Sequence, residues 1–267
     1  MRELLKLIFC EIYKYKRNKI LPALTALSLL FPVALVIITK SNLDTATTIT
    51  ELHAYFDSLF NDNMVYSAIL LLPGLFGCVS AIFFFNERDC DTFKNLRAIP
   101  VSRNELIFTK LIVMYLWMEV YSICSAISVS LFCFFLEPAA VYDVPFKILC
   151  NMLAGFTMAT VSLPVVVLVI YMNQSFLLSL LLSFLYSVVN WLLLIMFSTN
   201  DAFLRWLPLI NGFLLPSRFW GWRKAVLGID TLAALPLQEY IRTALYLLCF
   251  LAVCVFLIVR FYKKWSR

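Results

Sequence analysis

The 267-residue sequence is poor in charge, because Asp, Glu, Lys and Arg make up only 14% of it, about half the share in an ordinary globular domain. It also has six glycines, one histidine and no C-x-x-C pair among its eight cysteines. The single histidine, His53, has no neighbouring His or Cys to share a metal ion. The composition excludes a water-soluble domain of useful size, and the cysteines, mostly inside apolar runs, are expected to pack as small hydrophobic residues.

Motifs for catalysis are missing as well. The chain contains no G-x-x-x-x-G-K-[ST] phosphate loop and no G-x-S-x-G nucleophile motif. The formal net charge of +6 does not form a continuous basic face, since most basic residues stand at the ends of apolar stretches. We therefore expect no catalytic residue, no metal ion, no cofactor and no nucleic-acid partner for this chain.

Long apolar runs dominate instead: 63% of the residues are hydrophobic and the mean hydropathy is +0.89. Because a helix needs about 20 mostly apolar residues to cross a bilayer, the runs predict six spans. The sequence predicts an all-α integral membrane protein with residues 1–267 in a single transmembrane domain. The predicted spans cover about 20–39, 64–85, 107–136, 147–171, 176–197 and 240–260.

Three segments outside these spans have distinct patterns. Residues 2–16 carry apolar side chains at helical spacing with basic residues on other faces, which predicts an amphipathic helix in the cytoplasmic headgroup region. The polar stretch 40–63 reads as an outer loop. Residues 198–238 interleave tryptophans with arginines, prolines and glycines, which indicates an interfacial or re-entrant segment.

Orientation follows from the distribution of positive charge. Residues 2–19, 88–110 and 260–267 together hold 15 of the 22 Lys and Arg residues. All three segments lie on one side of a six-span topology, and short cytoplasmic segments carry the excess of basic residues. The pattern predicts a multi-pass membrane protein with both termini in the cytoplasm.

The most charged stretch, residues 86–110, separates the second and third spans. Asp91 and Thr92 are natural N-cap residues, the following FKNLRAI can form about two helical turns, and Pro100 ends them before Ser102 starts the next helix. The apolar positions of this short helix are Phe93, Leu96 and Ile99. Such an element can insert into a groove on a soluble partner, and a solvated loop that only fixes topology is the alternative interpretation.

The order of these features resembles the type-2 ABC exporter permeases, and most of all those of lantibiotic immunity and bacitracin resistance transporters. The resemblance rests on the amphipathic N-terminal helix, on Glu87 at the end of the second span, on the short helix Thr92–Ile99, and on the Pro100–Arg103 turn and Lys110 leading into the third span.

This resemblance implies a permease that works with two separate ATPase subunits, which bind ATP and Mg, and with a second permease, either identical or a sister subunit. It implies that segment 91–99 is a coupling helix against the ATPase and that residues 2–16 form an elbow-like helix. The implied coupling residues are Glu87, Asp91, Thr92, Phe93, Leu96, Arg97, Ile99 and Arg103. The implied cargo is an amphiphilic antimicrobial peptide, expelled from the membrane.

Four residues are candidates for the substrate path. Glu119 lies in the middle of the third span, where an ionised carboxylate is costly unless it is paired or faces water. It could attract a cationic peptide, pair with a partner subunit, or sit protonated and hydrogen-bonded to a neighbour. Trp206, Trp220 and Trp222 form either an ordinary aromatic belt or a lid that collects an amphiphilic peptide from the outer leaflet.

Other functions stay open from the residues alone. The chain could export a different hydrophobic substrate. An ion-driven secondary transporter should show an internal repeat and broken helices at the midplane, and no convincing three-plus-three repeat is visible. A membrane enzyme or assembly scaffold would need a polar catalytic cluster near an interface, whereas Glu119 is isolated in the sequence.

Overall fold

The computed structural model describes residues 2–15, 18–89, 102–172, 175–197, 201–204, 206–228 and 237–265, and these ranges contain helices and no strand. The elements in chain order are α1 (Arg2–Tyr15), α2 (Ile20–Ile38), α3 (Lys40–Asp44), α4 (Ile49–Val65), the π-helical η1 (Tyr66–Leu71), α5 (Leu72–Asp89), α7 (Arg103–Leu136), the short 3-10 helix η2 (Pro138–Ala140), α8 (Val144–Val161), α9 (Leu163–Met172), α10 (Phe176–Met196), α11 (Asp201–Leu204), α12 (Pro208–Val226) and α13 (Leu237–Trp265).

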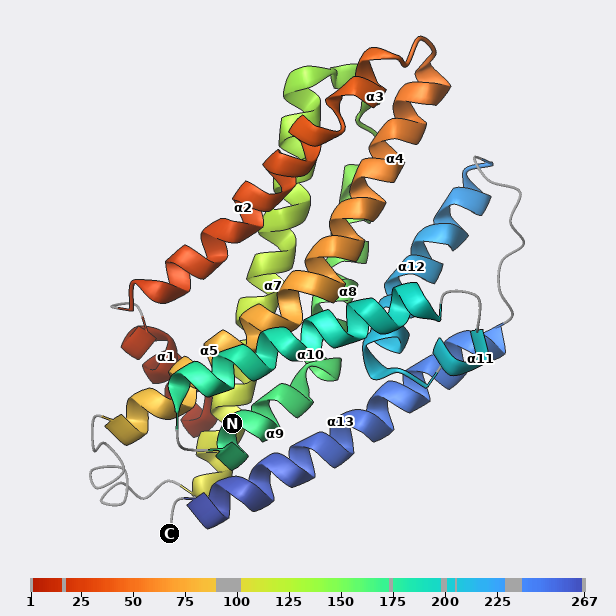
Figure 1. Ribbon diagram of the computed structural model, residues 1–267. Helices are drawn as coiled ribbons and strands as arrows, with labels where there is room; N and C mark the ends of the chain where they lie inside the picture. The colour runs from red at the N-terminus through yellow and green to blue at the C-terminus, as the bar shows by residue number, and fades with distance from the viewer. Residues whose placement is uncertain are drawn as a thin grey trace.

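Within the described ranges, six helical stretches are long and apolar enough to cross a bilayer: 20–38, 49–85, 103–136, 144–172, 176–196 and 237–264. The predicted all-α membrane fold with six spans is therefore confirmed. Both chain ends lie at one end of the bundle, which we call the terminus end (Figure 1). The opposite end, where α3 lies and where α4 and α8 begin, is called the far end (Figure 1).

Two long helical rods connect the ends. The first runs from α4 through the π-helical turn into α5, and the second is α7. The first rod starts at Ile49 instead of near residue 64, because Thr48 and Glu51 form a reciprocal capping box that begins a helix inside the stretch read as an outer loop. At 1.5 Å per residue, each rod is on the order of 50 Å long, more than the roughly 30 Å of a hydrocarbon core.

The rod α4–α5 is the centre of the bundle. In its most apolar 18-residue stretch, 89% of the residues are buried. The corresponding share is 22% in α2, 22% in α10 and 17% in α13. The main core is formed by aliphatic and aromatic side chains of α5 itself and of the helices packed against it, α7, α8, α9 and α13. The peripheral helices therefore present apolar side chains outward, as lipid-facing helices do.

Small residues allow the helices to approach closely. Gly77 of α5 packs directly against Ser183 of α10, and Gly155 of α8 packs against Ser122 of α7. A Cβ atom at either glycine would collide with the facing serine side chain. Membrane helices associate through such small-residue contacts, since lipid supplies no hydrophobic force to press them together.

Helix α12 lies within segment 198–238, for which the sequence predicted interfacial or re-entrant structure. Its Gly212 lies against the Val161 side chain and the Thr157 carbonyl, halfway along α8–α9, while its Arg223 reaches Asp143 at the start of α8. The helix thus runs antiparallel to α8, from the middle of the bundle to the far end (Figure 1). It brings the basic end of α12 beside α4 and α8.

Candidate functional site

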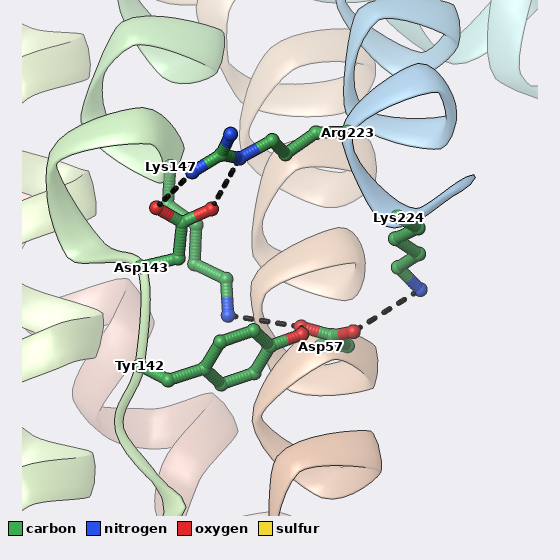
Figure 2. Close-up of polar contacts among 6 residues, drawn as sticks. All are labelled: Asp57, Tyr142, Asp143, Lys147, Arg223 and Lys224. Atoms are coloured by element: carbon green, nitrogen blue, oxygen red, sulfur yellow. Dashed lines mark hydrogen bonds and ion pairs between the residues drawn. The ribbon is translucent and has the colours of Figure 1, made fainter. Parts of the chain in front are cut away.

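A buried charge cluster occupies the far end, with the Asp57 carboxylate at its centre (Figure 2). Asp57 lies about two turns into α4 and is only 3% exposed. Its Oδ1 atom accepts hydrogen bonds from Lys147 Nζ at 2.9 Å and from the Tyr142 hydroxyl at 2.6 Å. Its Oδ2 atom lies 3.3 Å from Lys224 Nζ of α12. Each oxygen of this buried carboxylate therefore has a cationic partner.

A second ion pair completes the far-end cluster, which we define as Asp57, Tyr142, Asp143, Lys147, Arg223 and Lys224. The Arg223 guanidinium donates from Nε to Asp143 Oδ2 at 2.8 Å and from an Nη atom to Oδ1 at 3.2 Å. This two-pronged geometry matches the planar shapes of both groups. Asp143 has a left-handed backbone (φ 48°), which turns the chain into α8.

Lys147 is fully buried, so its ammonium group depends on the surrounding side chains. Its Nζ atom lies 3.7 Å from the ring centre of Phe56, 4.0 Å from that of Tyr142 and 4.9 Å from that of Trp220. Aromatic faces attract cations, and most strongly where water is excluded. The ion pair with Asp57 and the aromatic rings together compensate the loss of hydration.

The far-end cluster was not predicted from the sequence. Asp57 and Lys147 are 90 residues apart, and no local pattern joins them. One signal was present: Asp57 follows Phe56 and precedes Phe60 by one turn, so an acid lies within an apolar helical face. The cluster fastens α4, α8 and α12 to one another at the far end.

The Tyr142 hydroxyl gives the cluster a pH dependence at high pH. Burial and the hydrogen bond to Asp57 raise the pKa of Tyr142 above its ordinary value, so the phenol stays protonated when the protein is folded. Its contribution to stability is complete below the unfolded-state tyrosine pKa of about 10 and is lost as pH rises above that value. We expect Tyr142→Phe to lower the free energy of unfolding by about 1.5–3 kcal/mol at neutral pH.

We further expect the difference between wild type and Tyr142→Phe to shrink between pH 10 and 11. Detergent-denaturation titrations at pH 7, 10 and 11 measure both effects. Tyr171→Phe is the control, since Tyr171 is 64% exposed. An equal stability of the Tyr142→Phe variant and the wild type at neutral pH would contradict this prediction.

A second polar junction lies at the terminus end. The Lys110 side chain of α7 is fully buried, and its Nζ atom donates to the Phe83 carbonyl at 3.0 Å. It also lies 3.8 Å from Glu11 Oε2 of the buried face of α1. Glu11 is in addition 3.8 Å from Lys14. Helix α1 is thereby fixed to the same turns of α5 and α7 that flank the predicted coupling segment.

Most predicted coupling residues, namely Asp91, Thr92, Phe93, Leu96, Arg97 and Ile99, lie outside the described residues. Glu87 falls in the last turns of α5, and its side chain lies outside the description. Arg103 is the exposed first residue of α7. Ser102 caps α7 in a reciprocal box with Glu105, so the helix restarts where the sequence predicted.

The four predicted path residues do not converge on one place. Glu119 lies midway along α7, and its Oε2 atom is buried without a hydrogen-bond partner in the described part of the chain. Trp220 belongs to the aromatic surroundings of Lys147, whereas Trp222 is half-exposed and stacks on Phe219. Trp206 is 76% exposed beside α13, whose Tyr246 hydroxyl donates to its carbonyl.

The described residues form an all-helical membrane domain, and the sequence contains no phosphate loop. The sequence pattern of the family described as "ABC-2 family transporter protein" matches residues 7–190, and the chain belongs to this family. ABC-2 permeases work with ABC ATPase partners in general. The matched range includes α4 and α8 of the far-end cluster, and α12 lies beyond it.

One curated relative is a bacitracin transport permease from Bacillus licheniformis, 37% identical over 62 residues. The alignment covers 23% of this chain and 30% of the relative, so this chain spans less than a third of that protein. The similarity supports the resemblance to bacitracin resistance permeases.

Proposed function

We propose that this chain is the permease subunit of an ATP-driven exporter that expels an amphiphilic antimicrobial peptide, bacitracin-like or lantibiotic, from a bacterial cytoplasmic membrane. Two ABC ATPase subunits supply the energy, with ATP and Mg bound on those chains. A second permease, identical or a sister subunit, completes the transporter. Membership of the ABC-2 family, together with the partial bacitracin permease relative, is the observation that carries the proposal.

The distribution of positive charge supports a cytoplasmic location for the terminus end. Segments 2–19, 88–110 and 260–267 hold 15 of the 22 basic residues, and the described parts of these segments lie at that end. The predicted coupling segment 91–99 stands in the chain between α5 and α7. The described ends of these two helices face the cytoplasm in this orientation, on the side of a cytoplasmic ATPase.

The two rods supply a mechanical route for coupling. Movement at segment 91–99 acts on the end of α5 and on the start of α7, because these helices flank it directly. The α4–α5 rod carries Asp57, and α7 leads within a few residues to Tyr142 and Asp143. A push at the terminus end thus biases the arrangement of α4, α8 and α12 at the far end, a shift between two packings of the bundle.

Glu119 and the tryptophans remain our candidates for contact with the peptide. Glu119 fits this role because a carboxylate in a span is costly unless it is paired or faces water, and its buried Oε2 atom has no hydrogen-bond partner among the described residues. A cationic group of the peptide can supply that partner. Trp206 and Trp222, which are both exposed, can hold the amphiphilic peptide by its apolar face.

The test is reconstitution of the permease with its ATPase in lipid nanodiscs. We expect the peptide to stimulate ATP hydrolysis several-fold, and we expect the Phe93→Asp, Leu96→Asp double variant to lose both the stimulation and the capture of the ATPase in a pull-down. Glu119→Gln should keep the ATPase bound and lose the stimulation. The pull-down measures assembly with the ATPase, and the hydrolysis assay measures the response to the peptide.

Lys263→Asp is the matched control, because Lys263 is an exposed basic residue at the same end of the bundle. It should assemble and respond as the wild type does. Retention of the ATPase by the Phe93→Asp, Leu96→Asp variant would refute the coupling role of segment 91–99. Absence of stimulation by bacitracin and by lantibiotics alike would refute the proposed substrate class.

A further inference from the structure

An apolar groove lies between α1, the start of α2 and the middle of α7, with a volume of about 600 Å³. This volume is within the range of roughly 300–1,000 Å³ found for sites that enclose small molecules. Its walls include Phe9 and Tyr13 of α1, Pro22 of α2, and Trp117 and Val120 of α7. The family relationship assigns no ligand to this place.

The interior of the groove is mostly apolar. The two polar side chains on its α2–α7 wall bond to each other, because Trp117 Nε1 donates to Thr25 Oγ1 at 3.0 Å. Thr25 in turn donates to the Leu21 carbonyl at 2.9 Å. A peptide backbone entering here would therefore leave its own N–H and C=O groups without partners. A hydrocarbon chain has no polar groups, so its burial here leaves no hydrogen bond unmade.

Two lysines lie close to the groove along the chain, although neither lines it. Lys14 directly follows Tyr13 on α1, and Lys19 lies at the start of α2, two residues before Leu21. Both lysines are exposed, and Lys14 lies 3.8 Å from Glu11. Basic residues at the end of an amphipathic interfacial helix attract anionic headgroups. The groove and its rim therefore match a molecule with an apolar tail and a negatively charged head.

We propose that this groove binds one anionic phospholipid, with an acyl chain between α1, α2 and α7 and its headgroup phosphate at Lys14 and Lys19. The assignment to the cytoplasmic leaflet rests on the orientation in the proposed function, whereas the binding itself does not depend on transport. The bound lipid fills the space that α1 leaves beside α7, so it joins the elbow-like helix to the spans.

Trp117 allows a direct test, since it lines the groove and brominated acyl chains quench tryptophan on contact. The protein is reconstituted in phosphatidylcholine nanodiscs that contain increasing amounts of dibrominated phosphatidylglycerol or dibrominated phosphatidylcholine. The contribution of Trp117 is the difference between the wild type and Trp117→Phe. We expect phosphatidylglycerol to quench it saturably at a mole fraction at least fivefold lower than phosphatidylcholine does.

Two sets of variants test the acyl-chain contact and the headgroup contact separately. Val120→Phe, which puts a larger side chain into the groove, should abolish the saturable quenching, and Leu131→Phe, an exposed position on the same helix outside the groove, should leave it unchanged. Lys14→Gln with Lys19→Gln should remove the preference for phosphatidylglycerol. Equal quenching by both lipids, or no quenching of Trp117 because another chain covers the groove, would overturn the proposal. A failure of peptide-stimulated ATP hydrolysis would leave this binding result unaffected.

Discussion

Asp57→Ala is expected to destabilise the protein by about 3–5 kcal/mol, because it leaves the fully buried Lys147 without its anionic partner. Lys224 loses the same partner, but it is partly exposed and can regain water. The aromatic rings around Lys147 offset only part of the cost, since each cation–π contact contributes about 0.5–2 kcal/mol. Detergent-denaturation titration of the purified protein in mixed micelles measures the free energy of unfolding.

The buried ion pair between Asp57 and Lys147 is expected to be replaceable by two apolar side chains of similar volume. Asp57→Leu with Lys147→Met removes both buried charges and keeps the volume, so it should recover most of the stability lost in Asp57→Ala. Asp44→Ala is the control, because Asp44 is an exposed acid at the same end of the bundle. A double variant no more stable than Asp57→Ala would show that the cluster does more than balance two charges. The coupling assay on the double variant would then show whether the charges are needed for transport.

Gly77→Ala is expected to separate α5 from α10. The added Cβ would lie 2.8 Å from Val165 Cγ1 and would overlap the Ser183 side chain, and the next residue of α10, Phe184, also packs closely against Gly74. Overpacking of this kind costs about 1–3 kcal/mol even for a single methyl group. Gly77→Val should cost more and should reduce the yield of folded protein. The same denaturation titration measures the loss, and size-exclusion chromatography measures the folded fraction.

Gly221→Ala is the matched control, since a Cβ atom built at Gly221 of α12 meets nothing within 4 Å. It is expected to be neutral or slightly stabilising, because alanine favours the helix. Ser183→Gly should partly rescue Gly77→Ala, so that the double variant loses less stability than the two single changes added together. Strict additivity would mean that the two residues do not share this contact.

The fold was largely predictable because membrane spans follow from the length and hydropathy of local segments. The π-helical continuation from α4 into α5 was harder to foresee. Residues 49–63 are amphipathic and not uniformly apolar, and the Thr48–Glu51 capping box was the local sign of a helix there. Hydropathy identifies apolar segments long enough to cross a bilayer, but it does not identify a helix that extends beyond the membrane or packs against other helices.

The site residues were less predictable. The coupling segment was identified from resemblance, and its central residues lie outside the part of the chain that the structure describes. Lys110 was noted as a basic residue entering the third span, but its burial against Phe83 and Glu11 depends on how α1 docks. Asp57 and Lys147 come together only through tertiary packing, so a single sequence does not reveal that they are close in space. Trp220 was selected as an interfacial residue, and the structure places it beside a buried ammonium group.

The wide separation of Asp57 and Lys147 in the chain also bears on biosynthesis. They are 90 residues apart, so at roughly 5–20 residues per second a ribosome needs on the order of 10 s to make Lys147 after Asp57. During that interval the Asp57 carboxylate has no lysine to pair with, because Lys147 and Lys224 both follow it in the chain. Asp57 therefore stays hydrated until α8 packs against α4, so the docking of α8 is the step that buries this carboxylate.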